Sequence, residues 1–255
     1  MSLLFDSLFS SVAFSHLIVD VFNSSRPVLL TYLGLTETQI AVISTIYIWA
    51  SALTQPFFGW ISDRVGPRWL AAGGVLWMTV FFSGAVFLPG AAGLLCLIIA
   101  ALGSSSFHPV GTVQATLQGR NHLAGRETTA TSLFFTAGQL GHFVGPMITG
   151  LILARLGLPA MVILPIISIP IALTLAYQLR ANHPHPRPAQ GDGRVRLQAG
   201  VGFILLLAIV ATLQSWSQAN MINFVPKYIK DLGLSAATYG NIAGLFMGGS
   251  ALGNV

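Results

Sequence analysis

The feature that most constrains the fold of this chain is a series of eight long apolar runs, each continuous rather than alternating. A bilayer-spanning helix needs about 20 apolar residues, and such runs predict helices rather than barrel strands. Only 7% of the residues are charged, against about 25% in soluble domains, so lipid is the expected solvent. We therefore predict an all-α, multi-pass membrane protein. Its expected helices span residues 8–33, 38–60, 69–88, 92–116, 127–154, 158–179, 200–226 and 237–255.

Basic residues in the short loops predict the orientation. With a cytoplasmic N-terminus, the inner loops hold eight arginines and the outer loops hold three or four basic residues. An excess of Lys and Arg marks the cytoplasmic side. We therefore expect a location in the inner (plasma) membrane with the N-terminus in the cytoplasm. The net charge of +5 does not predict nucleic-acid binding, because the basic residues form no continuous patch.

Residues 180–199 are the one expected linker. A run of alternating His and Pro, His183–Pro188, is followed by the looser Gly191-Asp192-Gly193. Metal binding by this run is the alternative interpretation, but the prolines hold the imidazoles apart, which favours a solvated cytoplasmic linker. It divides an N-terminal six-helix half, residues 1–179, from the start of a second half, residues 200–255.

The second half repeats the first at a shift of 199 positions. This shift matches Pro27 with Pro226, Leu33–Thr36 with Leu232–Ser235, and residues 51–53 with 250–252. Chance similarity between apolar helices is the alternative, which the shared proline and turn disfavour. Because the sequence ends at Val255 inside the eighth expected helix, we expect a fragment, a split gene or an early stop. The missing second half would come from a full-length chain or from a split partner.

A charged segment between the second and third expected helices carries the signature G-x-x-x-D-R-x-G. It resembles the corresponding loop of the major facilitator superfamily of secondary transporters. The resemblance implies two six-helix halves, alternating access, and a loop that latches the cytoplasmic side; an ordinary topogenic loop is the alternative. Pro67 stands where the family usually has a basic residue. The gating-loop residues are Gly59, Asp63, Arg64, Gly66 and Arg68.

A second motif lies in the fifth expected helix, where Gly141, Gly145, Pro146 and Gly150 are regularly spaced. It resembles the G-x-x-x-G-P-x-x-G-G motif of the proton antiporters of the superfamily, with Thr149 in place of one glycine. The glycines would form a smooth packing face and the proline would bend the helix. Generic small-residue packing is the alternative.

Titratable groups inside membrane helices are the best pointers to function. His16 and Asp20 are spaced i, i+4 and share a helix face. Asp20 lies about 18 Å and His108 roughly 12–15 Å from the inner ends of their helices, so the three are expected to meet near the midplane. A His–Asp pair can carry a proton. His108 could instead satisfy carbonyls freed by Pro109, and His142 is interpreted as a packing residue.

The seventh expected helix carries neutral polar groups at membrane depth, which suit a polar solute or bonds to other helices. These residues are Gln214, Trp216, Gln218, Asn220 and Asn223.

The segments Ala13–Asp20 and Gly103–Pro109, with the Gly59 loop, together resemble the fosmidomycin-resistance branch of the superfamily, whose members are efflux carriers of the bacterial inner membrane. In that branch an acidic residue commonly follows the His-Pro pair, and here it is Val110. The resemblance implies proton-coupled export (antiport) of a small organic solute, with His16, Asp20 and His108 as coupling or substrate groups.

Two alternatives stay open: an uptake permease of the same fold, and a non-transporting membrane sensor or assembly protein derived from a transporter. An enzyme is not expected, because the sequence carries no Ser–His–Asp set, H-E-x-x-H or cysteine-ligand cluster. No cofactor and no metal site are expected. The expected partners are a small-molecule substrate, protons and the lipid bilayer.

Overall fold

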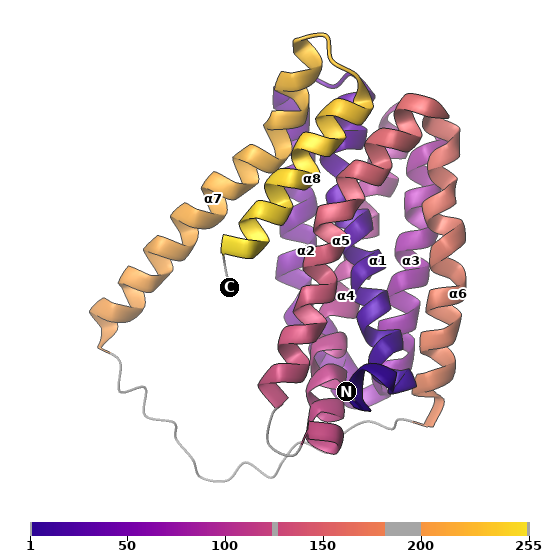
Figure 1. Cartoon of the computed structure of the whole chain (residues 1–255), viewed down its shortest axis with the longest axis vertical. Helices are drawn as coiled ribbons and strands as arrows, with labels where there is room; N and C mark the ends of the chain where they lie inside the picture. Colours follow the sequence, from indigo (N-terminus) through magenta and orange to yellow (C-terminus); the bar gives the residue numbers. More distant parts are fainter. Residues whose placement is uncertain (1, 124–126, 182–199, 254–255) are drawn as a thin grey trace.

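The computed structural model describes residues 2–123, 127–181 and 200–253 (Figure 1). The described residues contain helices and no strand, which confirms the all-α prediction. Most of the predicted linker, residues 182–199, lies outside the described residues. The α-helices are α1 (Ser7–Tyr32), α2 (Glu37–Val65), α3 (Pro67–Phe87), α4 (Gly90–Leu123), α5 (Glu127–Arg155), α6 (Ile163–Gln178), α7 (Val201–Asp231) and α8 (Ala236–Gly253). Three short 3₁₀ segments, η1 (Ser2–Phe5), η2 (Leu158–Val162) and η3 (Leu179–Ala181), accompany them.

Six of the described helical segments are long and apolar enough to cross a membrane, namely α2, α3, α4, α5, residues 158–181 and α7. Helix α1 differs, because it carries buried polar side chains, among them His16, Asp20 and Arg26. It lies in the middle of the bundle and contacts α4, α5 and α6 (Figure 1). Its polar groups therefore face protein rather than lipid, and this places the candidate site inside the bundle.

The charged segment after the second helix is more helical than the sequence predicted. Helix α2 does not end at residue 60 but continues to Val65, so the predicted loop shrinks to the single residue Gly66. Gly66 has φ 90°, a conformation that favours glycine, and Pro67 opens α3 at a position where a missing N–H costs nothing. Arg64 donates to the Trp60 carbonyl over 2.9 Å, and a cation at a helix C-terminus favours the extension.

Two other predicted helix ends are also too early. Helix α4 continues from residue 116 to Leu123, and α7 continues past Pro226 to Asp231. The residues beyond residue 116 are polar but compatible with a helix, so hydropathy underestimated the length of α4. Pro226 lies inside α7 just as Pro27 lies inside α1.

Two turns with the same hydrogen bonds follow α1 and α7, 199 positions apart. Gly34 and Gly233 have φ 78° and 82°. In each turn the next residue donates its N–H to the carbonyl five positions earlier, over 3.4 Å in both. This is the Schellman arrangement, in which a left-handed glycine ends a helix. The matched sequence Leu-Gly-Leu-(Thr/Ser) thus encodes the same local structure twice.

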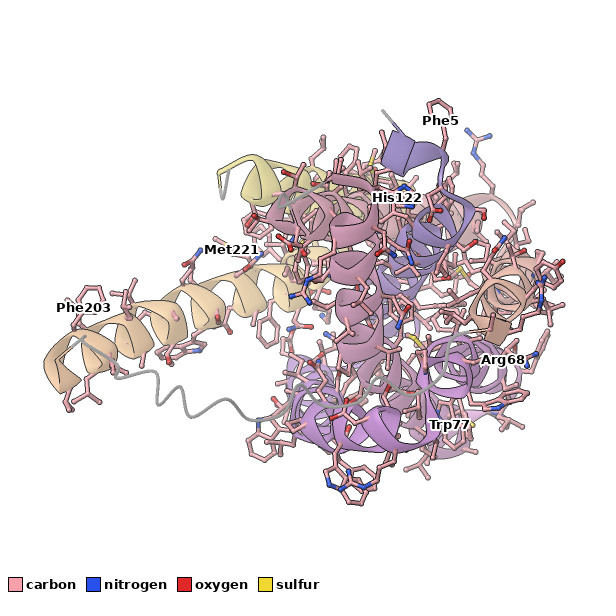
Figure 2. All side chains as sticks on the ribbon, turned by 90° about the horizontal axis from the view of Figure 1, so that it is seen from below. Phe5, Arg68, Trp77, His122, Phe203 and Met221 are labelled. Atoms are coloured by element: carbon pink, nitrogen blue, oxygen red, sulfur yellow. The ribbon has the colours of Figure 1, made fainter. Side chains whose placement is uncertain are left out.

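We call the end of the bundle that holds these two turns, residues 33–36 and 232–235, the turn end. Here α7 is bound to the first two helices: Lys230 Nζ donates to the Thr31 carbonyl over 2.7 Å, and Lys227 Nζ lies 3.1 Å from Glu37 Oε1. Away from the turn end, α7 leans outward, and residues 201–217 are all exposed (Figure 1). Figure 2 shows Phe203 far from the bundle formed by α1 to α6. The contacts of α7 with α1 and α2 are therefore concentrated at the turn end.

Candidate functional site

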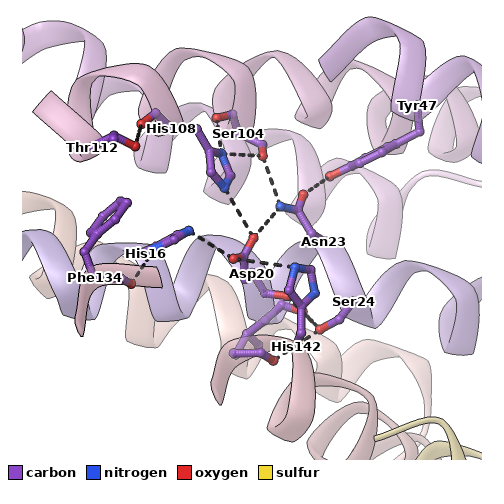
Figure 3. A network of polar contacts seen from close by, with 12 residues as sticks. His16, Asp20, Asn23, Ser24, Tyr47, Ser104, His108, Thr112, Phe134 and His142 are labelled. Atoms are coloured by element: carbon purple, nitrogen blue, oxygen red, sulfur yellow. Dashed lines mark hydrogen bonds and ion pairs between the residues drawn. The ribbon is translucent and has the colours of Figure 1, made fainter. Parts of the chain in front are cut away.

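A buried carboxylate surrounded by three imidazoles lies where α1, α4 and α5 meet (Figure 3). Asp20 Oδ2 lies 3.1 Å from His16 Nε2 and 3.5 Å from His142 Nε2, and Asp20 Oδ1 lies 3.5 Å from His108 Nε2. The Asp20 side chain is 5% exposed, whereas those of His108 and His142 are 22% and 27% exposed. We call His16, Asp20, His108 and His142 the Asp20 cluster. The carboxylate of the cluster is therefore buried, whereas the His108 and His142 imidazoles are partly exposed.

Glycines on α5 make room for this cluster. A Cβ built on Gly138 would lie 2.6 Å from Asp20 Oδ2 and 2.6 Å from His16 Nε2. One turn further along, a Cβ on Gly141 would collide with the Leu17 carbonyl. Small residues let membrane helices approach closely, and here they bring α5 directly against the face of α1 that carries Asp20. The cluster therefore depends on backbone contact between two helices.

Hydrogen bonds to the backbone fix the tautomers of two histidines. His16 Nδ1 lies 2.8 Å from the Phe134 carbonyl, and His108 Nδ1 lies 2.8 Å from the Ser104 carbonyl. A carbonyl oxygen only accepts, so both Nδ1 atoms carry hydrogen. In a neutral imidazole the remaining Nε2 is then an acceptor, and it faces a carboxylate oxygen that is also an acceptor. A proton on Asp20 or on one of the imidazoles would turn such a contact into a hydrogen bond, one proton for each contact.

His142 completes the cluster from α5, which the sequence-based packing interpretation missed. Its Nδ1 is buried without a hydrogen-bond partner. A neutral His142 with its hydrogen on Nε2 would therefore donate to Asp20 and leave Nδ1 as the acceptor. The sequence placed His142 in a glycine-rich packing motif, and nothing in that motif shows which neighbour the imidazole faces.

Three further polar groups extend the cluster along α1 toward the turn end. Asn23 Nδ2 donates to Asp20 Oδ1 over 2.8 Å and to Ser104 Oγ over 3.0 Å. Tyr47 of α2 donates its hydroxyl hydrogen to Asn23 Oδ1 over 2.6 Å. Sequence analysis missed these residues, although Asn23 is spaced i+3 from Asp20 and shares its helix face. The network now connects α1, α2 and α4.

The cluster also satisfies the donor geometry of a cation site. Ligand atoms of His16, Asp20 and His108 lie within 4.8 Å of one another. In both histidines Nδ1–H donates to a backbone carbonyl, which is the usual support of a metal-bound imidazole. The expectation of no metal site considered spacing along the chain alone, and that spacing does not show that α1 and α4 bring three donors together.

Most of the polar residues predicted on α7 lie away from the cluster. Gln214 and Trp216 are on its exposed stretch. Gln218 donates to Ser250 of α8 over 3.1 Å, and Asn220 donates to the Trp216 carbonyl over 2.9 Å. Asn223, nearer the turn end, accepts hydrogen bonds from Arg26 of α1 and Ser44 of α2.

The gating-loop residues lie at the end of the bundle opposite the turn end. Gly59 faces Pro109 of α4, at 3.7 Å from a Cβ built on the glycine. Gly59 and Asp63 line a cavity of about 160 Å³ between α2 and α4. The guanidinium groups of Arg64 and Arg68 lie over the rings of Trp60 and Trp69, at 3.6 and 4.8 Å.

The helix-packing motif on α5 contacts two different helices. Gly141 and Gly145 face α1, whereas Gly150 faces Ala236 and Gly240 of α8. Pro146 lies inside α5, and its carbonyl faces Gly240. The glycines therefore join α5 both to the Asp20 helix and to the helix that follows α7.

Comparison with known proteins agrees with this architecture. The family model of the Major Facilitator Superfamily matches residues 8–255. The chain belongs to the major facilitator superfamily. It is therefore a multi-pass membrane protein of a family that transports small solutes, and not an enzyme.

Two curated relatives show how this major facilitator chain compares in sequence. The fosmidomycin resistance protein of Escherichia coli is 31% identical over 158 residues, which cover 59% of this chain and 37% of the relative. The uncharacterized MFS-type transporter YfnC of Bacillus subtilis is 30% identical over 132 residues, covering 51% of this chain and 31% of the relative. The chain thus spans about a third of the length of these relatives.

Solved structures share the fold at low sequence identity. A peptide transporter POT in complex with sulfate aligns with a TM-score of 0.60 and 16% identity, over 89% of this chain and 49% of that one. The POT family transporter PepTSo aligns with a TM-score of 0.55 and 16% identity, over 94% and 54%. These likenesses concern the arrangement of helices alone.

Proposed function

We propose that this chain carries the proton-coupling site of a secondary active transporter that exports a small organic solute by alternating access. Residues 1–179 would be the N-terminal half, 180–199 a cytoplasmic linker and 200–255 the start of the second half. The turn end would face away from the cytoplasm, with the N-terminus cytoplasmic, in the inner (plasma) membrane.

The observation that carries the proposal is the mismatch of acceptors in the Asp20 cluster. His16 and His108 both present Nε2 to one carboxylate while Nδ1–H donates to the backbone. A shared proton would resolve this mismatch at one contact, and histidine exchanges a proton in the physiological range. Partial exposure of His108 and His142 provides a route for that proton. A proton carrier with a buried carboxylate fits coupling better than a purely structural ion pair.

The arrangement of α7 supports alternating access. Its contacts with α1 and α2 gather at the turn end, through Lys227, Lys230 and Asn223.

Export is favoured over uptake by the similarity to a fosmidomycin resistance protein. Fosmidomycin is therefore the first solute to test.

The test uses everted inner-membrane vesicles that hold the intact protein, acidified inside by respiration, with a pH-sensitive dye. Adding fosmidomycin to the wild type should release protons from the vesicles, because antiport exchanges them for solute. Asp20→Asn should abolish this release, whereas the matched carboxylate variant Glu127→Gln, at the opposite end from the turns, should retain it. Proton release in the wild type should depend on pH in the physiological range, where histidine exchanges protons.

Proton release by Asp20→Asn with the wild-type pH dependence would refute the assignment of the coupling site. Solute entering the same compartment together with protons would instead identify the uptake permease. A sensor or assembly protein would give no flux for fosmidomycin or for a panel of other solutes, and its deletion would disrupt a partner complex.

A further inference from the structure

A buried arginine lies beyond the Asp20 cluster toward the turn end. Arg26 is 6% exposed and follows Asn23 by one helical turn on the same face of α1. Its guanidinium carbon lies 4.4 Å from the centre of the Tyr47 ring. Its Nη2 donates to Asn223 Oδ1 over 3.3 Å, and Asn223 Oδ1 also accepts from Ser44 over 2.9 Å. The side chain is therefore enclosed by α1, α2 and α7.

The charge of Arg26 is not neutralised by any described residue. No described carboxylate lies within ion-pair distance of its guanidinium, and its Nε is buried without a hydrogen-bond partner. A guanidinium has five N–H donors, and the bond to Asn223 is the one made to described residues. Burying an unpaired charge is strongly unfavourable unless an anion or several acceptors compensate it. The neutral amide oxygen of Asn223 supplies only a weak substitute.

Polar contacts connect Arg26 to the proton site. Tyr47 donates to Asn23, and Asn23 donates to Asp20, while the Tyr47 ring lies against the guanidinium. A charge that arrives at either end of this path therefore acts on the other through two side chains. Asn23, one helical turn before Arg26, is partly exposed.

We propose that Arg26 binds the anionic group of the transported solute, a carboxylate, phosphate or phosphonate. The planar guanidinium suits bidentate binding of such groups. An anion would replace Asn223 Oδ1 as the acceptor and so release α7 from α1 at this level. The proposal rests on the proposed transport function and assigns its substrate class. Because Arg26 lies inside the bundle, a dissolved solute rather than a lipid headgroup is the expected source.

The test measures binding of inorganic phosphate and of acetate by calorimetry to the intact protein in phosphatidylcholine nanodiscs. Arg26→Gln should weaken phosphate binding at least about tenfold, the effect of losing hydrogen bonds to a charged group. Arg26→Lys should bind phosphate with intermediate affinity, since lysine keeps the positive charge but lacks the planar guanidinium that binds two oxygens at once. The exposed-arginine control Arg155→Gln should match the wild type. Asn223→Ala should bind phosphate at least as tightly, because it removes the competing acceptor.

Absence of phosphate and acetate binding to the wild type, or wild-type affinity in a folded Arg26→Gln, would overturn the anion site. Loss of phosphate binding on adding phosphatidylglycerol to the nanodiscs would assign the site to a lipid headgroup and overturn the solute assignment. Asp20→Asn should still bind phosphate. Proton release that persists in Asp20→Asn, while phosphate binding depends on Arg26, would overturn the proposed coupling site and leave this inference standing. Proton release that is lost in Asp20→Asn, while phosphate binding does not depend on Arg26, would overturn this inference and leave the coupling site standing.

Discussion

Replacing Gly138 with alanine should disable the Asp20 cluster without altering any of its polar groups. The added Cβ would lie 2.6 Å from both Asp20 Oδ2 and His16 Nε2, whereas ordinary contact begins at 3.4 Å. Either α5 or the side chains of Asp20 and His16 must therefore move by about 0.8 Å. If the shift separates the pair, the distance of 3.1 Å between His16 and Asp20 grows to about 3.9 Å, beyond hydrogen-bond range.

The energetic cost can be bounded from the same contacts. Losing one hydrogen bond to a charged group costs about 1.5–3 kcal/mol. Replacing glycine by alanine in a helix returns about 1 kcal/mol, so Gly138→Ala should be destabilised by about 0.5–2 kcal/mol. Gly73 of α3 is the matched control, because a Cβ there meets nothing within 4 Å. Gly73→Ala should be neutral or stabilised by up to about 1 kcal/mol.

Two measurements decide the outcome for Gly138→Ala. Denaturant unfolding in bicelles compares the free energies of unfolding of the two alanine variants, and the vesicle assay compares their proton release. The reasoning is wrong if Gly138→Ala matches Gly73→Ala in stability and also releases protons with the wild-type pH dependence. A destabilised variant with normal proton release would show that coupling does not depend on the 3.1 Å distance between His16 and Asp20.

Two further predictions concern the turn end and the cation affinity of the cluster. Lys230→Met removes the 2.7 Å bond from the charged ammonium to the Thr31 carbonyl, worth about 1.5–3 kcal/mol. The ratio of separated to closed turn ends should therefore rise at least about tenfold. Spin labels at positions 33 and 232 report this ratio, and an unchanged distance distribution would contradict the prediction. Zn²⁺ should bind the Asp20 cluster more tightly at pH 7.5 than at pH 6, because its ligands must lose protons; calorimetry that finds the same affinity in Asp20→Asn would place the metal elsewhere.

The sequence predicted the helical architecture well, because hydropathy reads directly whether a segment can lie in lipid. It failed at ends where helix formation and hydropathy diverge. Helix α2 continues through the charged residues to Val65, since Arg64 stacks on Trp60 and caps its own helix end. Of the predicted gating-loop residues, Gly66 is the one outside a helix, and its positive φ is a conformation that favours glycine.

At the site, the sequence identified His16, Asp20 and His108 as groups able to meet, and the structure brings them together. The i, i+4 spacing and the depth along each helix carry that information. Which side of α5 faces α1 depends on packing between helices, so the contact of His142 with Asp20 could not be read from its motif. The sequence pattern gave Arg26 no role, because its burial depends on contacts with α2 and α7, which no local pattern reveals.

The glycine contacts between α1 and α5 have a mechanical consequence. Backbone lies against backbone at Gly141 and Gly145, so these two helices have no compressible side-chain layer between them and should move as one body. Under the proposed coupling, a change of charge at Asp20 would therefore not open the contact between α1 and α5. It would instead act through the hydrogen bonds of Asn23 and Tyr47, toward α2 and α7.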